Sequence, residues 1–215
     1  MSNSTRNAGC PRVAGQGAGL ADPRVRLLLG ATGIATTAAI VRRDRVGPRE
    51  TQVFHALNTL PNEIFAPVWL VMQGGSLGSV FIAGALAGAS GQAALARRIL
   101  LTGSTTWALS KAIKRGIRRP RPAALLPEAV TRGRAQTGLG YLSGHAGVAL
   151  AVGIAAYPHL GQRGRLATTV GIPLVWLSRI YVGAHLPLDV VGGAGLGLAI
   201  DAAIELTSAT RNRSK

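Results

Sequence analysis

The sequence predicts an all-α integral membrane bundle of about six transmembrane helices, with a functional site at one membrane face. Hydrophobic residues make up 47% of the 215 residues and charged residues only 15%, which is too apolar for an ordinary soluble domain. Long apolar runs alternate with short basic runs along most of the chain. Histidine, arginine, lysine and aspartate side chains stand near the ends of several apolar runs, where they could meet.

The chain begins with a polar tail and a short apolar run. Residues 1–25 are rich in Gly, Asn, Ser and Arg and lack the apolar core of a signal peptide, so we expect them to be disordered. The first span is predicted at residues 27–41, because arginines stop the apolar run there. Residues 49–60 have the mixed pattern of an amphipathic interfacial helix, with His55 as a surface residue.

The second and third spans follow directly. Residues 64–89 contain no charged side chain, which is a strong signal for a span, and a glycine pair inside this run predicts a kink. Arg97 and Arg98 are expected to mark a loop. The third span is then predicted at residues 99–113.

A polar connector separates the third span from the rest. The prolines within residues 115–122 end the preceding helix, and residues 123–140 form the connector. Arg163 and Arg165 are expected to form a basic turn between two later spans. The last three spans are predicted at residues 140–160, 166–177 and 186–206. The domain organisation is thus a tail at 1–25, a six-helix membrane domain at 26–208, and a basic tail at 209–215.

The formal net charge of +16 fits either a nucleic-acid binder or a membrane protein with basic loops. Aromatic residues are only 4%, and the basic residues lie between apolar runs, so we expect no nucleic-acid partner. The single cysteine, Cys10, excludes a disulfide within the chain and a cysteine metal site. The chain lacks the clustered carboxylates of a hard-metal site, so no metal and no other cofactor is expected.

Span order predicts which polar residues meet. Lys114 and Arg121 follow the third span. Ser143, Gly144 and His145 open the fourth with no crossing between, and Arg179 and His185 follow two crossings later. All these groups should therefore lie at one face of the membrane.

Their chemistry predicts a site for a phosphate-like anion. Pro187 suits the first turn of a helix, so His185 should lie at a helix N-terminus, with Asp189 one turn in. That carboxylate can fix the imidazole tautomer, which leaves the other nitrogen free to attack phosphorus. His145 can then protonate the leaving oxygen and activate water, while the nearby cations stabilise the transition state.

Several of these residues have structural alternatives. A lone histidine in an apolar stretch, such as His145, is usually a hydrogen-bonded core residue, and Ser143 can simply cap its helix. The basic residues of 115–119 are interpreted as a topology signal at a span end. Asp201 and Glu205 are interpreted as interfacial residues without a catalytic role.

Three motifs carry a resemblance to a known family. They are Lys114-x6-Arg121-Pro122, Ser143-Gly144-His145, and Ser178-Arg179-x5-His185-x3-Asp189. The set resembles the three-part signature of the type 2 phosphatidic acid phosphatase superfamily, which contains membrane lipid phosphate phosphatases and the soluble vanadium haloperoxidases. The second motif usually begins with proline, and here Leu142 stands in that place.

The resemblance implies a metal-independent lipid phosphatase in a bacterial plasma membrane, with its site on the extracytoplasmic face. It implies His185 as nucleophile, Asp189 as its partner and His145 as general acid. The phosphate would be bound by Lys114, Arg121, Ser143, Gly144 and Arg179. Candidate substrates are phosphatidic acid, phosphatidylglycerol phosphate and polyprenyl phosphates or diphosphates, with a preference for a polyprenyl diphosphate, which would make the protein an undecaprenyl diphosphate phosphatase.

Two alternatives come from other functional classes. One is a transporter or channel whose charges line a pathway, but such charges should be spread through the membrane depth. The other is a vanadate-dependent haloperoxidase-like enzyme. The apolar spans and the lack of a large soluble helical domain argue against it.

Overall fold

The computed structural model of the chain describes residues 20–213, with side chains described through residue 210. Every regular element in this part of the chain is helical, which confirms the all-α fold class. The helices are α1 (Pro23–Arg43), α2 (Pro48–Asn58), α3 (Phe65–Met72), α4 (Leu77–Ala89), α5 (Ala93–Ile117), α6 (Gly144–Ala156), α7 (Gln162–Tyr181) and α8 (Pro187–Arg213). Four 3-10 turns join them: η1 (Asn62–Ile64), η2 (Gln73–Gly75), η3 (Pro122–Ala124) and η4 (Tyr157–His159). Cys10 and most of the predicted N-terminal tail lie outside the described residues.

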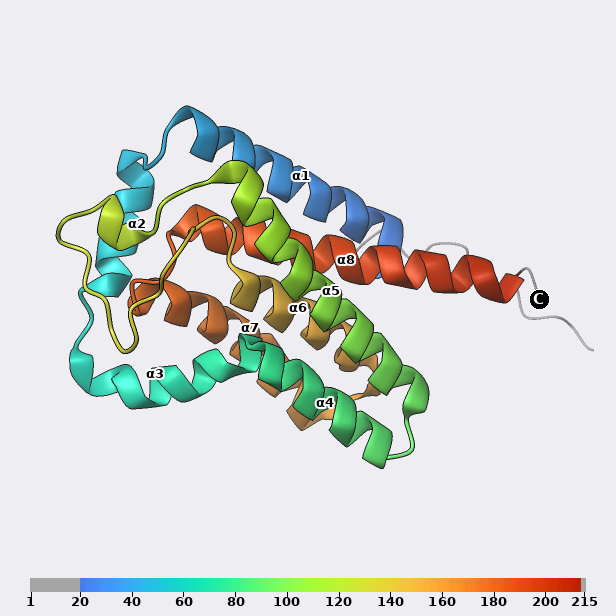
Figure 1. Ribbon diagram of the computed structural model, residues 1–215. Helices are drawn as coiled ribbons and strands as arrows, with labels where there is room; N and C mark the ends of the chain where they lie inside the picture. Colours follow the sequence, from blue (N-terminus) through green and yellow to red (C-terminus); the bar gives the residue numbers. More distant parts are fainter. Residues whose placement is uncertain (1–19, 214–215) are drawn as a thin grey trace, which may run out of the picture.

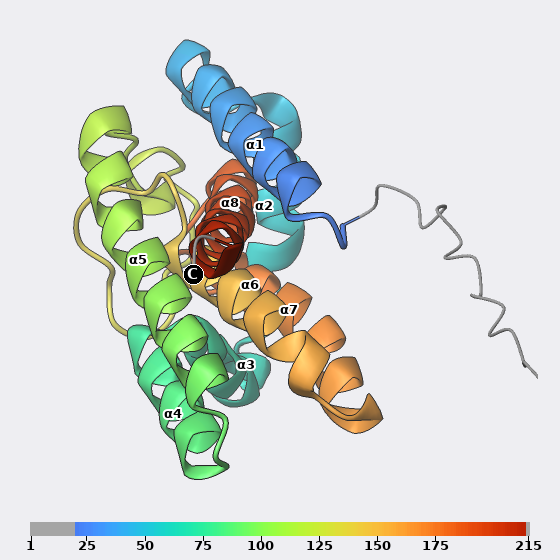
Figure 2. The same cartoon turned by 90° about the vertical axis from the view of Figure 1, so that its right-hand side faces the viewer.

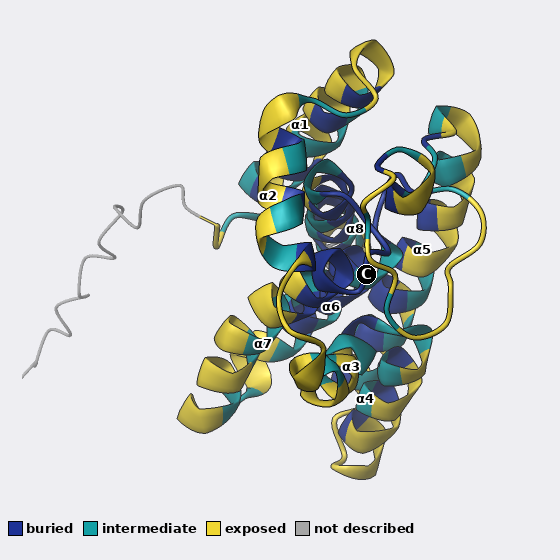
Figure 3. Ribbon diagram, turned by 90° about the vertical axis from the view of Figure 1, so that its left-hand side faces the viewer, coloured by how far each residue is buried: buried dark blue, intermediate teal, exposed yellow. Residues whose placement is uncertain are grey.

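Helix α8 forms the centre of the bundle. It is seen nearly end-on in Figure 2, with α1, α5 and α6 around it. Helix α1 runs along its length in Figure 1, and α1 and α6 make its most extensive contacts. The buried residues gather on α6 and on the first half of α8, whereas the outer faces of α1, α2 and α7 are exposed (Figure 3).

Glycines let α6 and α8 pack at very short distance. A Cβ atom at Gly193 would lie 2.2 Å from the carbonyl oxygen of Ser143, and one at Gly197 would lie 2.2 Å from that of Gly147. Real Cβ atoms do not come so close to an oxygen, so only glycine fits at these positions. This close approach sets the N-terminus of α6 against the first turns of α8, where the candidate site lies.

The predicted second span is broken into two helices. Helices α3 and α4 are bent by 64° about the short turn η2, which confirms the kink expected at the glycine pair. Ser76 caps the N-terminus of α4, because its hydroxyl accepts a hydrogen bond from Ser79 N at 3.2 Å. Gly75 packs so closely on α6 that a Cβ there would lie 2.4 Å from His145 O.

Two loop predictions are wrong. Arg97 and Arg98 lie inside α5, and Arg163 and Arg165 lie inside the first turn of α7. Arginine has a good helix propensity, and a basic residue in a first or second turn is tolerated where its side chain finds carboxylates or solvent. Arg98 finds carboxylates, because its guanidinium donates to Asp201 at 2.8 Å and to Glu205 at 2.6 Å.

The same carboxylates form an ion-pair cluster at the far end of α8. Arg26 of α1 donates to Asp201 at 2.8 Å and to Glu205 at 2.7 Å. Asp201 is completely buried, while Glu205 keeps a side-chain exposure of 34%, and their place at the membrane interface stays a prediction. A buried carboxylate is stable only when it is paired, and the two arginines supply that pairing. The cluster joins α1, α5 and α8.

The connector between α5 and α6 is fixed by side-chain contacts to α2 and α7. Asn58 donates to Val130 O and to Tyr181 O, both at 2.9 Å, and accepts from Val130 N at 2.8 Å. Arg132 donates to Asn58 O and Tyr181 O at 2.7 Å, and its guanidinium lies 4.2 Å from the Tyr181 ring centroid. These contacts bring a long loop back over the ends of α5 and α7.

Among the described residues, α1 (Pro23–Arg43) and the part of α8 from Pro187 to Thr210 are long and apolar enough to cross a membrane, and the bent α3–α4 pair would add a third span. Large apolar side chains point outward on several helices, among them Leu28, Trp69, Phe81, Leu86 and Leu166. The predicted number of six spans stays a prediction.

Candidate active site

His185 lies in the short loop between α7 and α8. Helix α7 ends at Tyr181, and the backbone N–H groups of Ala184 and His185 both donate to Arg179 O at 3.1 Å. Pro187 is the first residue of α8, as its missing N–H predicts. The loop therefore folds back on the end of α7 and presents His185 just before the N-terminus of α8.

Asp189 is the nearest carboxylate to this histidine. Its Oδ2 lies 3.5 Å from His185 Nδ1, which is too long for a hydrogen bond. The same Oδ2 accepts from Leu186 N at 2.9 Å, while Nδ1 has no hydrogen-bond partner among the described residues. The two groups are thus adjacent, and a small ring movement would close the predicted pairing.

The N-terminus of α6 meets the first turn of α8. Ser143 caps α6, because its hydroxyl accepts from Ala146 N at 3.4 Å, and its own N–H donates to Asp189 O at 2.8 Å. A Cβ at Gly144 would lie 2.8 Å from the Ser110 hydroxyl of α5. Glycine at this position lets α5 pack on the first turn of α6, where His145 follows.

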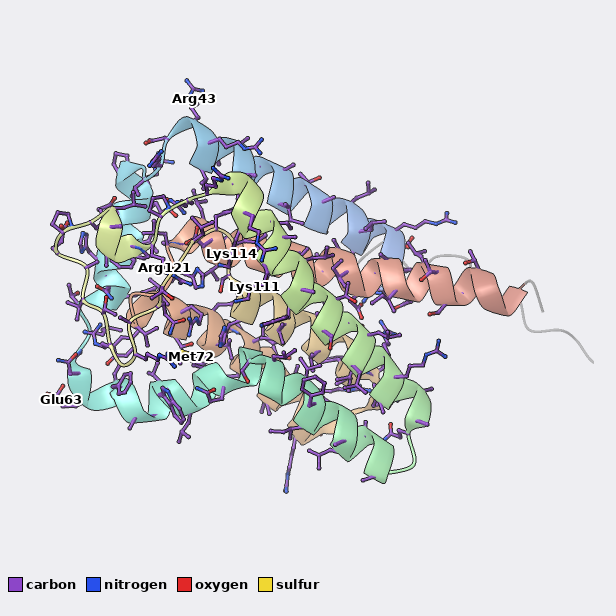
Figure 4. The ribbon with its side chains drawn as sticks, viewed as in Figure 1. Arg43, Glu63, Met72, Lys111, Lys114 and Arg121 are labelled. Carbon is purple, nitrogen blue, oxygen red and sulfur yellow. The ribbon has the colours of Figure 1, made fainter. Side chains whose placement is uncertain are left out.

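Two of the predicted cations come from the end of α5 and from the loop beyond it. Lys114 Nζ donates to Gly140 O at 2.8 Å and to Leu139 O at 3.2 Å. Arg121 Nη1 donates to Ala184 O at 2.7 Å, one residue before His185. In Figure 4 both side chains lie inside the bundle, at the end that the connector covers, whereas Arg43 and Glu63 lie at the edge of the bundle.

The third cation, Arg179, is almost completely buried at the end of α7. One guanidinium nitrogen contacts the sulfur atom of Met72, at the end of α3, and Nε has no hydrogen-bond partner in the part of the chain that the structure describes. A buried guanidinium held by a thioether and lacking a carboxylate is poorly satisfied, since such a group normally binds anionic oxygens. Arg179 is therefore able to accept an anion.

The electrostatics of His185 bring these residues together. Burial lowers the pKa of His185 well below its ordinary value, and the charges of Lys114, Arg179, Arg121 and His145 lower it further. The imidazole is therefore neutral at physiological pH and can act as a nucleophile. All eight residues predicted for the site lie at one end of the bundle.

Sequence reasoning missed two charged residues here. Arg119, interpreted as a topology signal, is 2% exposed, and Nη1 donates to Asp189 Oδ1 at 2.7 Å. The same guanidinium binds Glu50 of α2, a residue predicted only to lie on an interfacial helix. The one signal in the sequence is the charge ratio: with 8 acidic residues against 24 basic ones, each carboxylate has several possible arginine partners.

Leu142, which stands where the signature usually has proline, is completely buried. It packs with Tyr141, Val41 and Leu196 in an apolar cluster beneath the site. Tyr141 shares a hydrogen bond of 2.9 Å with Thr37 of α1. The loop before Ser143 is thus held by packing on α1 and α8.

Beside the site lies an apolar groove of about 260 Å³ between α2, α3 and α7. Its walls include Leu57, Val68, Val71, Leu177 and Tyr181. Ser178 and Tyr181, which flank Arg179 on α7, also line it. Within residues 20–213, no group of three or more histidine, cysteine, aspartate or glutamate side chains is arranged to hold a metal ion.

Comparison with known proteins supports the resemblance seen in the motifs. The family described as the PAP2 superfamily matches residues 94–213. The fold is similar to that of a transmembrane PAP2 type phosphatidylglycerolphosphate phosphatase from Bacillus subtilis, with a TM-score of 0.70 and 22% identity over 88% of this chain and 96% of that one. It is also similar to Aquifex aeolicus LpxE, with a TM-score of 0.65 and 21% identity over 73% and 94% of the two chains. No curated protein matches the chain.

Proposed function

This chain belongs to the PAP2 superfamily, and we propose that it is an integral membrane enzyme that hydrolyses a lipid phosphomonoester or diphosphate. The observation that carries the proposal is a buried His185 whose pKa is lowered by burial and by the nearby charges of Lys114, Arg179 and Arg121. A cationic pocket around a neutral imidazole is suited to bind a phosphate and attack it. The structurally similar B. subtilis protein is itself a phosphatidylglycerolphosphate phosphatase, which agrees with this proposal.

In the proposed first step, His185 attacks the phosphorus atom. Nδ1 faces Asp189, so Nε2 is the nitrogen that forms the new N–P bond. The bond between phosphorus and the leaving oxygen breaks, and His145, which takes up a proton when the phosphate anion binds beside it, gives that proton to the oxygen. Lys114, Arg121 and Arg179 stabilise the charge on the equatorial oxygens, together with backbone N–H groups at the start of α6.

In the second step, water hydrolyses the phosphohistidine. His145, now neutral, takes a proton from the attacking water as the new P–O bond forms. The N–P bond breaks, inorganic phosphate leaves, and His185 returns to its neutral form. Asp189 stabilises the positive charge that develops on the imidazole in both steps.

The apolar groove between α2, α3 and α7 supports a lipid as substrate. Its lining is almost entirely apolar and includes Ser178 and Tyr181, which flank Arg179 in the sequence. A hydrocarbon chain in this groove would leave its phosphate next to the cations. Phosphatidic acid, phosphatidylglycerol phosphate and polyprenyl phosphates or diphosphates are the candidates, and we favour a polyprenyl diphosphate. We place the site on the extracytoplasmic face of a bacterial plasma membrane.

The test is phosphate release by the purified protein in detergent with EDTA, measured over a panel of these lipids. We expect vanadate-sensitive release from at least one lipid, and loss of at least a thousandfold in kcat for His185→Ala, because removal of a nucleophile eliminates the covalent path. A phosphohistidine is stable in base and is hydrolysed in acid. Phosphate-labelled protein that survives base but not acid should therefore appear in the wild type and not in this variant.

His55→Ala is the matched control. His55 is a partly exposed histidine of α2 that pairs with Glu128 at 2.9 Å, and it belongs to no part of the proposed mechanism. Its activity should stay within twofold of the wild type. Phosphate release by folded His185→Ala at the wild-type rate would refute the mechanism, and a requirement for a divalent metal would count against it as well.

A further inference from the structure

A buried arginine links the proposed nucleophile to α2. Arg119 lies between α5 and η3 and has no exposed side-chain surface. Its Nη1 donates to Asp189 Oδ1 at 2.7 Å and to Glu50 Oε1 at 3.1 Å, and its Nε donates to Arg45 O at 3.0 Å. Every one of these partners belongs to the protein, so this guanidinium is committed internally and is not placed to bind substrate.

Glu50 holds the other side of Arg119. It lies in the first turn of α2 and forms a second ion pair with Nη2 of the arginine. Its Oε1 also accepts a hydrogen bond of 2.8 Å from Leu188 N, in the first turn of α8. Glu50 therefore fixes both the arginine and the start of the helix that carries Asp189.

Asp189 is oriented through both of its oxygens. Oδ1 is bound by Arg119, and Oδ2 is bound by Leu186 N at 2.9 Å. This arrangement aims Oδ2 at His185 Nδ1, 3.5 Å away. The carboxylate cannot rotate toward another partner without losing its bond to the arginine.

The charge of Arg119 matters as much as its position. The groups that face His185 from α5, α6, α7 and the loop after α5 are Lys114, His145, Arg179 and Arg121. Asp189 opposes these charges with its own, yet it is completely buried. A carboxyl group cut off from water keeps a negative charge only beside a positive partner, and Arg119 is the positive partner in direct contact with it. Lys114 and Arg121 also favour the charge of Asp189 from a greater distance, whereas the charge of Glu50 opposes it.

Arg119 itself is held in the charged form. Burial opposes its charge, but the hydrogen bonds and the charges of Glu50 and Asp189 outweigh burial and raise the pKa of Arg119. The guanidinium fork also matches two carboxylates at once, which an ammonium group cannot do.

We propose that Arg119 and Glu50 are positioning residues for the nucleophile: Arg119 keeps Asp189 ionised and aimed at Nδ1 of His185, and Glu50 fixes Arg119. This inference rests on the proposed phosphatase activity. Without Arg119, Asp189 would take a proton from water and lose its capacity to accept from the imidazole. His185 could then hold its proton on the wrong nitrogen, so Nε2 would no longer attack.

The test compares Arg119→Gln with the wild type in detergent, on the lipid phosphate that the wild type hydrolyses fastest. We expect kcat to fall on the order of 10²–10⁴-fold, as when the orienting carboxylate of a catalytic histidine is neutralised. KM should change by less than about threefold, since Arg119 does not touch substrate. The acid limb of the kcat profile should move to higher pH, because activity then requires Asp189 to ionise unaided.

Two further variants separate positioning from folding. Arg119→Lys keeps the positive charge but loses the fork, so it should return the acid limb to the wild-type pH while restoring kcat only in part. Arg115→Gln changes an exposed arginine of the same basic run and should behave as the wild type in kcat, KM and pH profile. A lower Tm for Arg119→Gln with an unchanged acid limb would reduce Arg119 to a structural role and overturn the inference, as would a rise in KM alone.

Imidazole ¹⁵N spectra test the same inference without any substrate. The wild type should show His185 with its proton on Nδ1, and Arg119→Gln should show a mixture of tautomers. If the wild type releases no phosphate from any lipid, the proposed function fails while these spectra still decide the role of Arg119. If the wild type is active and both proteins show the same tautomer, the positioning role alone is refuted.

Discussion

Two histidines of this chain show how position decides chemistry. His55 pairs with Glu128 at the surface, whereas His185 is 3% exposed and surrounded by cations. In the empty pocket, protonation of His185 is disfavoured, since it would add a positive charge to a buried positive cluster. The pocket thus maintains a nucleophile in its reactive form before any substrate arrives.

This environment predicts how His185 titrates. Because the pKa of His185 is lowered well below its ordinary value, the native imidazole should stay neutral as the pH falls from 7.5 to 5.5. The unfolded protein should take up that proton near pH 6.5, so the free energy of unfolding should fall as the pH drops below about 6.5. Carbon-13 histidine spectra, assigned by loss of one signal in His185→Gln, would measure the titration. A midpoint near pH 6.5 in the native protein would contradict the prediction.

At the scale of elements, the site depends on how closely α6 and α8 approach. The N-cap of α6 and the carboxylate-bearing turn of α8 share a hydrogen bond of 2.8 Å between Ser143 N and Asp189 O. Glycines on α8 allow the two helices to approach this closely, because larger side chains there would collide with backbone carbonyl oxygens at α6. The close packing that brings the two proposed catalytic histidines to the same place therefore depends on glycines of α8.

Substitution of these glycines should separate stability from activity. Gly193→Ala and Gly197→Ala should each cost about 1–3 kcal/mol through overpacking, which lowers Tm by roughly 2–4 °C per kcal/mol. Gly193→Ala should also lower kcat, because it displaces the carbonyl of Ser143 at the start of α6. Gly197→Ala acts one turn further from the site and should lower kcat less.

Gly171→Ala on α7 is the matched control, since a Cβ atom there has no neighbour within 4 Å. Its Tm should be unchanged or slightly higher, because alanine restricts the unfolded chain more than glycine does. Thermal unfolding in detergent and phosphate release would measure all three variants. Equal Tm values for the three would show that α6 and α8 can part without cost.

At the scale of the whole molecule, the sequence predicted what depends on local spacing. The histidine before α8, the carboxylate one turn later and the serine cap of α6 follow from short motifs, and the structure has them where the motifs indicate. The sequence did not predict pairings between residues that are far apart along the chain. Arg119 and Glu50 are 69 residues apart, and Arg98 and Asp201 are 103 apart.

The wrong loop at Arg97 and Arg98 has a physical origin in the pairing of Arg98. The rule that basic residues end spans assumes that a charge must leave the bilayer core. A charge paired with a buried carboxylate does not have to leave, and α5 extends past Arg98 because Asp201 of α8 pairs with it. Only the assembled bundle reveals such a partner, since nothing in the local pattern around Arg98 indicates it.

Both ends of the bundle carry basic residues, but those at the end away from the site have no proposed catalytic role, and they predict the membrane orientation. Helices α5 and α7 both begin at the end away from the site, where Arg97, Arg163 and Arg165 add charges that no active site requires. Basic residues near span ends favour the cytoplasm, so we expect the connector and the site to face outward.

Single cysteines in a Cys10→Ser background would test this orientation in intact cells with a membrane-impermeant thiol reagent. Gln136→Cys, on the exposed connector, should be labelled at once, whereas Gln162→Cys, at the start of α7, should react only after permeabilisation. The reverse pattern would place the site in the cytoplasm, and labelling of both positions from outside would show that α7 does not connect opposite faces of the membrane.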